Sequence, residues 1–419
     1  MELLVLLLLW AALAASSATS KDRSQCSWDP QEAVLQCILK PSALEEDRLH
    51  LVFARHQTQA TLKLRLLCQD LRPRQRLLSL RVDYEGSPLS ASGSLRNPWP
   101  HLQSLHVENC PLASFVVGLN GLEPEGKKPN SDVLKDVIQP LLGGRPLGGL
   151  RHLSLVNVSQ ELSSSLWCEV ATSNLVSLNL SSNGLDRLPG RHCQQQPESS
   201  SSHLEVLNLS NNAISRLDLD NHWLGLASTT SLTHLDVSRN RLQAIRLGEM
   251  QRLLVVDVSD NKLSSGRELM EAMAASASTL RELHAQGNQM EQLPNLQNVV
   301  HFDRLLLLNL SRNAFQEAKE AKGLLGFKPL VALDLSHNKF TRVDDHLFSD
   351  LVHLQVLSLA HNQIADIWPG ALDSLTRLHV LVLSHNNMDE KGLNNHLLGH
   401  MTDLRSLSLD HNRLKTIPR

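Results

Sequence analysis

Leucines recur at fixed places within a repeated motif through the second half of the chain. From residue 175 the sequence matches LxxLxLxxNxL ten times, as in LEVLNLSNNAI (204–214), LVALDLSHNKF (330–340) and LQVLSLAHNQI (354–364). The asparagines that close the matches are 21 to 29 residues apart. They are Asn183, Asn212, Asn240, Asn261, Asn288, Asn313, Asn338, Asn362, Asn386 and Asn412. This regularity predicts an array of stacked repeats rather than separate globular domains.

Each motif has the alternation of a half-buried strand, because its two central leucines lie between polar residues. One unit cannot bury its leucines alone, so neighbouring units must stack into a continuous core. The closing asparagine is expected to turn inward, where its amide satisfies backbone groups that a tight turn leaves unpaired. Motif and period are those of leucine-rich repeats. We therefore expect an α/β solenoid, a horseshoe with a parallel, concave β-sheet and a disulfide-stapled N-terminal cap.

The first half of the chain is less regular. Weaker units at LLSLRV (77–82), LQSLHV (102–107) and LRHLSLVNV (150–158) bring the total to about 13 repeats over residues 77–419. They are interrupted by an insertion at 113–149, in which 132–142 has the pattern of a short helix, and by a polar loop at 194–202.

One later stretch, SSGRELMEAMAASAST (264–279), predicts a helix. Ser264 or Ser265 can cap it, and the apolar face is supplied by Leu269, Met270 and Met273.

Residues 1–20 are typical of a secretory signal peptide, with an apolar run from Leu3 to Ala15 followed by small residues. The run is too short to span a membrane, and no other stretch is long enough. Forty basic and 43 acidic residues nearly cancel, which argues against a nucleic-acid partner. Aromatic residues make up only 3% of the chain, so the core is expected to be mainly aliphatic. The mature chain is expected to be extracellular.

All six cysteines lie before residue 194, and an even number in a secreted chain favours three disulfides. The cysteines are Cys26, Cys37, Cys68, Cys110, Cys168 and Cys193. A zinc site is the alternative, but the sequence lacks the paired CxxC motif that is typical of such a site. Cys168 and Cys193 are about one repeat apart, a spacing that suits a disulfide between adjacent coils.

The N-terminal part contains, in order, CSWDPQEAVLQC (26–37), LKLRLLC (62–68), LHVENC (105–110) and LWCEVATSNLVSLNLSSNGLDRLP (166–189). With this part included, the chain resembles the ectodomain of invertebrate Toll-type receptors, and the resemblance covers nearly all of the mature chain. It implies an N-terminal cap at 21–76, with Cys26 paired to Cys37 and Cys68 paired to Cys110. It also implies a ligand-binding role, a cystine-knot cytokine as partner, and two ectodomains brought together on binding.

The chain carries no cysteine-rich C-terminal cap, membrane span or TIR domain of such receptors, and LKTIPR leaves the apolar edge of a repeat uncovered. The alternatives are a receptor fragment on the outer face of the plasma membrane, a secreted adhesion or structural protein, and a soluble decoy. The HExxH, P-loop and GxSxG motifs are absent, so neither an enzyme nor a cofactor is expected.

Three sets of residues are candidate sites on the repeat surface. The first is an apolar stripe for partner binding on the strands of later repeats, at Leu306, Leu307, Val331, Ala332, Val356, Val380 and Val382. The interpretation we favour is that these positions are partly covered by neighbouring turns.

The second set is His337, His361, His385 and His411, which directly precede four successive asparagines of the motif. Stacked imidazoles about 5 Å apart would repel one another when protonated, which suggests a pH-sensitive surface. The alternative is that they are ordinary solvated turn residues. The third set comprises the N-glycosylation sequons at Asn157, Asn179, Asn208 and Asn309.

Overall fold

The computed structural model describes residues 25–29, 34–39, 48–53, 62–68, 78–84, 102–109, 112–116, 150–158, 174–188, 203–219, 231–294, 300–316, 324–392 and 401–416. The predicted signal peptide, the loop at 194–202 and residues 117–149 of the insertion lie outside this part. The chain divides into two compact units. Unit 1 comprises residues 1–185, 189–209 and 222–231, and unit 2 comprises 186–188, 210–221 and 232–419. Each unit is described by itself.

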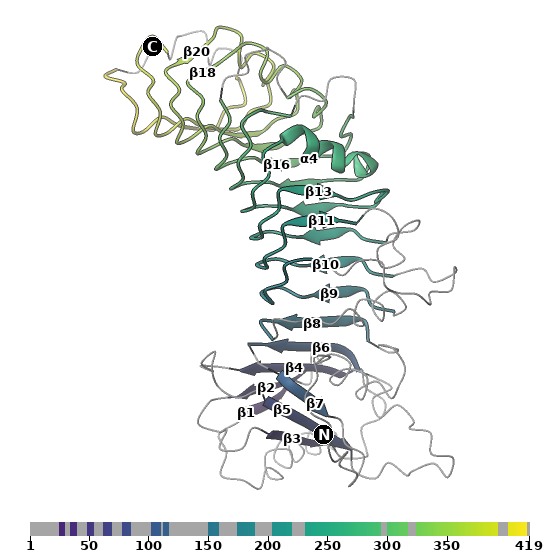
Figure 1. Ribbon diagram of the computed structural model, residues 1–419. Coiled ribbons are helices and arrows are strands. Elements are labelled where there is room, and N and C mark those ends of the chain that lie inside the picture. Colours follow the sequence, from purple (N-terminus) through teal and green to yellow (C-terminus); the bar gives the residue numbers. More distant parts are fainter. Residues whose placement is uncertain are drawn as a thin grey trace, which may run out of the picture. The chain divides into compact units, whose positions relative to one another are not determined.

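The main sheet of unit 1 begins with an antiparallel pair, β1 (Gln25–Asp29) and β2 (Val34–Leu39), and continues from β2 in parallel (Figure 1). The following strands, in spatial order, are β4 (Leu62–Cys68), β6 (Leu102–Glu108), β8 (His152–Val156), β9 (Ser177–Asn179) and β10 (Val206–Asn208). Leu64 and Leu66 of β4 are buried, whereas Lys63 and Arg65 are exposed. The segment predicted as a cap thus supplies strands to the sheet of the repeats.

A second parallel sheet of unit 1 consists of β3 (Arg48–Phe53), β5 (Leu78–Tyr84) and β7 (Leu112–Val116). It differs from the sequence-based expectation in two places. LLSLRV (77–82) was expected in the main sheet, but its strand β5 lies in this second sheet, and the first residues of the expected insertion at 113–149 belong to β7. Strands in chain order alternate between the two sheets from β2 to β8, so the early coils have a strand on each side.

The main sheet of unit 2 is parallel and in register, with its strands following one another in chain order. Its strands are β12 (His234–Asp236), β14 (Val255–Asp257), β15 (Glu282–His284), β16 (Leu307–Asn309), β17 (Ala332–Asp334), β19 (Val356–Ser358), β21 (Val380–Val382) and β22 (Ser406–Ser408). The central residue is buried in each strand from β12 to β21, and its two neighbours point outward. The parallel solenoid of stacked coils is therefore confirmed.

Unit 2 also has two small parallel sheets, separate from the main sheet. One pairs β11 (Arg216–Asp218) with β13 (Ala244–Arg246), and the other pairs β18 (Arg342–Val343) with β20 (Asp366–Ile367). The helical elements of the described residues are α4 (Gly266–Ala272) and the short 3₁₀ helix η3 (Ala274–Ser276). The remaining described return segments are turns and extended chain.

The core is mostly leucine, with phenylalanines concentrated in the later coils. Phe302, Phe315, Phe327, Phe340 and Phe348 are among the largest fully buried side chains. The rings of Phe302 and Phe327 stack with their centroids 5.6 Å apart. The expectation of a mainly aliphatic core is confirmed, and most of the few phenylalanines of the chain fill it.

The motif asparagines form a ladder inside the stack. The Oδ1 atom of Asn338 accepts a hydrogen bond from the backbone N–H of Phe315 (3.1 Å). Its Nδ2 atom donates to the carbonyl oxygens of Leu310 (3.2 Å) and Leu335 (3.0 Å). Since Phe315 and Leu310 lie in the preceding coil, the amide joins adjacent coils. Equivalent contacts to the preceding coil are made by Asn183, Asn261, Asn288, Asn313, Asn362, Asn386 and Asn412.

Helix α4 confirms that a helix begins in the predicted stretch 264–279, but it is shorter than predicted: it ends at Ala272 and is followed by η3 and a turn. Ser265 is the N-cap, and its hydroxyl accepts the backbone N–H of Glu268 at 3.2 Å. Leu269, Met270 and Met273 are buried, as the apolar face requires. Of the two serines that can cap the helix by sequence, the structure selects Ser265.

Candidate functional site

The outward-facing position at the end of several main strands has a local structural role. It is the residue four places before the ladder asparagine, and where it is Asn or Asp with a defined contact, its side-chain oxygen accepts the backbone N–H two residues later. In unit 2 this contact is made by Asp236, Asp257, Asn309 and Asp334, at 2.8 to 3.0 Å, and in unit 1 by Asn179 at 3.0 Å. These side chains stabilise the turn that follows the strand through an Asx-type hydrogen bond. This contact was not predicted from the sequence.

Three of the four sequons fall on this position, at Asn179, Asn208 and Asn309, and the turn contact is defined at the first and the last of them. Asn179 and Asn309 use Oδ1 for the turn, and Asn309 also accepts the hydroxyl of Ser311 at 2.8 Å. At Asn157 the nitrogen that a glycan would modify donates to Oδ1 of Asn109 at 2.9 Å. Asn208 is half-buried. Glycosylation at all four asparagines stays a prediction.

The cysteine predictions fall mainly outside the described residues. Cys110, Cys168 and Cys193 lie there, whereas Cys68 at the end of β4 is buried and disulfide-bonded. Cys26 and Cys37 are directly opposite in the antiparallel register of β1 and β2. Opposite residues of such a pair have Cα atoms about 4.5–5.5 Å apart, within the range of a disulfide. This register is compatible with the predicted pairing, which stays a prediction.

The apolar stripe lies on the outward face of the unit 2 sheet. Leu307, Ala332, Val356 and Val380 are aligned in register on the neighbouring strands β16, β17, β19 and β21. Val356 is 38% exposed and Leu306, just before β16, is 44% exposed. The other members of the stripe are half-buried, namely Leu307, Val331, Ala332, Val380 and Val382. Five of the seven side chains of the stripe are thus partly covered, and Leu306 and Val356 are exposed to solvent. We call the seven residues of the stripe the apolar patch.

Polar side chains border the apolar patch. Along the same row, Glu282 lies in register with Leu307 at one end and Ser406 with Val380 at the other. In the neighbouring row, Asn309, Asp334 and Ser358 precede Val382. Strands are about 4.8 Å apart, so the four aligned side chains extend over about 15 Å.

The residue before each ladder asparagine has a left-handed backbone conformation. In unit 2 the non-glycine residues there have φ between 52° and 55°, and Gly287 has φ 67°. These non-glycine residues are Asn211, Arg239, Asp260, Arg312, His337, His361, His385 and His411. Because the same φ recurs in every coil, the side chains at this position in neighbouring coils point in the same direction and contact one another. Arg312, for example, reaches past Gly287 to Asp260 at 3.1 Å.

His337, His361, His385 and His411 form a stacked column, which we call the histidine column. Successive ring centroids are 4.1, 4.1 and 4.0 Å apart, and the interplanar angles are 9° to 13°. The rings therefore lie closer together than the 5 Å expected from strand spacing. Burial lowers the pKa of His385, and repulsion from His411 and then His361 lowers it further, against the attraction of Asp410. The pH-sensitive surface stays a prediction.

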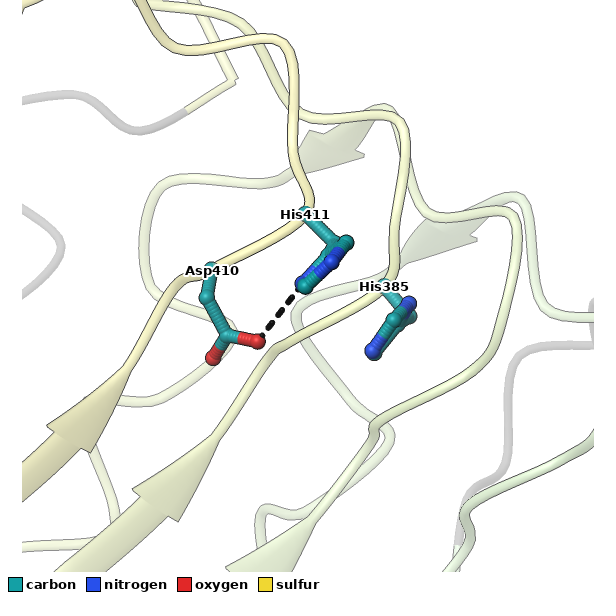
Figure 2. Close-up of side chains that lie close together, drawn as sticks. All are labelled: His385, Asp410 and His411. Atoms are coloured by element: carbon teal, nitrogen blue, oxygen red, sulfur yellow. Dashed lines mark hydrogen bonds and ion pairs between the residues drawn. The ribbon is translucent and has the colours of Figure 1, made fainter.

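The last pair of the column has an acidic neighbour. Figure 2 shows Asp410 beside His411, with the His385 ring parallel to the His411 ring. Oδ2 of Asp410 lies 2.9 Å from Nδ1 of His411. This hydrogen bond, followed by one from Ser384, lowers the pKa of the Asp410 carboxyl. One donor atom from each of His385, Asp410 and His411 lies within 4.8 Å of the others.

One exposed aromatic residue was missed by the sequence reading. Trp368 directly follows β20 and is 40% exposed. The guanidinium carbon of Arg342, on the neighbouring strand β18, lies 5.5 Å from the centre of its ring, a cation–π contact. The signal in the sequence was a tryptophan in DIWPGAL, where the equivalent segment of the preceding repeat reads RVDDHLF.

Comparisons with known proteins identify the repeats. Residues 328–388 match one leucine-rich repeat family model, and residues 200–224 and 229–244 match another. Fibromodulin of Oryctolagus cuniculus is 39% identical over 77 residues, which cover 18% of this chain and 50% of that protein. Tsukushi of Gallus gallus is 33% identical over 137 residues, which cover 31% of this chain and 35% of that protein. The matches thus span at most half the length of these relatives.

Among solved structures, two similar folds cover most of the chain. The APL1 leucine-rich repeat domain is 22% identical, with a TM-score of 0.47 and coverage of 88% of this chain and 85% of that one. The ectodomain of the plant receptor kinase GASSHO1/SCHENGEN3 from Arabidopsis thaliana is 20% identical, with a TM-score of 0.48 and coverage of 84% and 39%. The motif, the stacked parallel coils of the described residues and the family models show leucine-rich repeats in the matched part of this chain.

Leucine-rich repeats are an architecture that commonly provides an extended surface for binding other proteins. In the part of the chain that the structure describes, no helix has the length and apolar character needed to cross a membrane.

Proposed function

We propose that this chain is an extracellular protein-recognition module that binds a protein partner through the apolar patch of unit 2. The observation that carries the proposal is the in-register row of Leu307, Ala332, Val356 and Val380, with Val356 and the adjoining Leu306 open to solvent. An apolar centre within a polar rim is the usual composition of a protein interface. Repeat proteins generally bind through such an extended sheet surface.

Substitution of Val356 by Asp tests this surface. A carboxylate buried at the centre of an interface, without a partner, is expected to cost about 2 kcal/mol or more, or about 30-fold in Kd. The matched control is Gln363→Asp, which places the same charge at an exposed position beyond the ladder asparagine of the same coil. The secreted chain and both variants would be screened by biolayer interferometry against purified extracellular proteins, including cystine-knot cytokines.

We expect a partner that binds the native chain and Gln363→Asp but binds Val356→Asp at least about 30-fold more weakly. Equal binding of all three chains would contradict the patch as the binding surface. Far-UV circular dichroism of each variant checks that the repeats remain folded.

The finer proposal is a Toll-type receptor ectodomain that recognises a cystine-knot cytokine. It is supported by the order of the cysteine segments and by the opposed positions of Cys26 and Cys37 in β1 and β2. A secreted adhesion protein and a soluble decoy are the alternatives. Sequencing of transcripts beyond the codon for Arg419 separates them, since a membrane span and a TIR domain would support the receptor, and a stop codon after a short cap would support a secreted protein.

A further inference from the structure

The histidine column brings together metal-binding groups that are far apart in the sequence. Neutral imidazole nitrogen is among the preferred ligands of Zn²⁺, Cu²⁺ and Ni²⁺. In four successive coils the left-handed backbone positions stack these rings 4.0 to 4.1 Å apart. Only at the last pair does a carboxylate join two rings, at Asp410.

We propose that His385, His411 and Asp410 bind one divalent transition-metal ion of the Zn²⁺ class. Two imidazoles and a carboxylate form a known three-ligand set for Zn²⁺, in which water or a further ligand completes the tetrahedron. The sequence contains no spacing motif for this site, because its ligands come from two different coils, those of β21 and β22.

The distances between donors are close to those that a tetrahedral ion requires. With metal–ligand bonds of about 2.0–2.2 Å, two donors of one ion lie about 3.3 Å apart. Nδ1 of His411 and Oδ2 of Asp410 are already 2.9 Å apart. Only the nitrogen of His385 must approach, from within 4.8 Å of the other two donors. A rotation of its ring out of the stack brings it closer.

Two of the three ligand side chains are open to solvent, whereas His385 is half-buried. The side chains of His411 and Asp410 are 66% and 60% exposed. Before binding, Nδ1 of His411 and Oδ2 of Asp410 share a hydrogen bond. In that bond Nδ1–H donates to the carboxylate. On binding, Nδ1 gives up this proton: a neutral ring moves to the tautomer with its proton on Nε2 by exchange with water, and a charged ring releases the Nδ1 proton to solvent. The lone pair of Nδ1 then binds the ion. The carboxylate supplies the second ligand and a negative charge.

The preceding coils lack the carboxylate. The position of Asp410, two residues before the ladder asparagine, is occupied by Ser336, Ala360 and Ser384 in the earlier coils of the histidine column. His337 and His361 therefore form a stacked pair without an acidic ligand. This difference predicts one tight site at the last pair, and it predicts that an ion would join the coils of β21 and β22.

The experiment is zinc titration of the whole secreted chain, purified without a polyhistidine tag and stripped of metal. Calorimetry at neutral pH measures affinity and stoichiometry, and circular dichroism measures Tm with and without ZnCl₂. His411→Asn removes one ligand, and Asp410→Asn removes the charge at nearly unchanged size. The control is His346→Asn, which removes an exposed histidine of unit 2 outside the column.

We expect one Zn²⁺ to bind the native chain and His346→Asn alike, and to raise the Tm of both. Asp410→Asn is expected to bind at least tenfold more weakly, and His411→Asn is expected to lose both the tight site and the rise in Tm. Equal affinity and an equal rise in Tm in the native chain and both site variants would overturn the proposal. So would the absence of zinc binding to the native chain. Because the substituted side chains are exposed, the circular dichroism spectra of the variants without metal should match that of the native chain without metal.

Discussion

At the scale of single residues, position within the coil decides what each asparagine does. Asn338, at the ladder position, is buried and joins two coils, whereas Asn309, four places before a ladder position, is half-buried and holds its own turn. The sequence predicted the ladder because its pattern repeats ten times. It did not predict the turn contact, since Asn and Asp alternate there with Ser, His and Val, and the partner N–H becomes available only when the chain turns.

Replacement of Asn338 by Ala should strongly destabilise unit 2. It leaves the backbone N–H of Phe315 without its acceptor inside the stack, and the carbonyl of Leu310 keeps only one of its two amide donors, that of Asn313. An unsatisfied buried group costs about 1–3 kcal/mol and the lost hydrogen bond to Leu310 adds to this, so we expect a loss of about 3 kcal/mol in the free energy of unfolding. Urea denaturation followed by circular dichroism measures it. Lys339→Ala, at the exposed next residue, should change stability by less than about 0.5 kcal/mol; similar losses for both would contradict the role of the amide.

At the scale of elements, long and periodic segments were predicted well from sequence. Helix α4 lies within 264–279 because a serine cap and three apolar residues on one face determine it locally. The small sheets β11–β13 and β18–β20 were not predicted, because strands of two or three residues contain too little alternation to recognise. β5 was assigned to the wrong sheet since its alternating pattern is the same in either sheet.

The cap of α4 gives a prediction with a built-in control. Ser265→Ala removes the acceptor for the N–H of Glu268 and should cost about 1 kcal/mol. Ser264→Ala, one residue earlier on an exposed serine that does not cap the helix, should leave the free energy of unfolding nearly unchanged. Thermal or urea unfolding of both variants makes the comparison. A larger loss for Ser264→Ala would mean that the other serine caps the helix in solution.

At the scale of the whole molecule, the two units are stabilised differently. All six cysteines belong to unit 1, whereas the histidine column, the apolar patch and most of the closing asparagines belong to unit 2. The sequence could predict this division of the cysteines but not their pairing, because six cysteines allow 15 pairings. Stability in repeat proteins comes largely from contacts between neighbouring coils. A covalent bond in unit 1 therefore has little direct effect on coils several repeats away.

Reduction of the disulfides should consequently loosen unit 1 and leave unit 2 almost unchanged. A disulfide of a secreted domain contributes about 2–5 kcal/mol, mainly by restricting the unfolded chain. After treatment with a phosphine reductant, hydrogen exchange should accelerate in peptides that contain β4 and β6. Peptides that contain β17 and β19 should keep their protection, because leucine packing and the asparagine ladder hold them without any cysteine. Mass spectrometry resolves the two sets in one experiment, and alkylation without reduction is the control. If protection fell equally in both units, the coils would be coupled over a longer range than contact between neighbours allows.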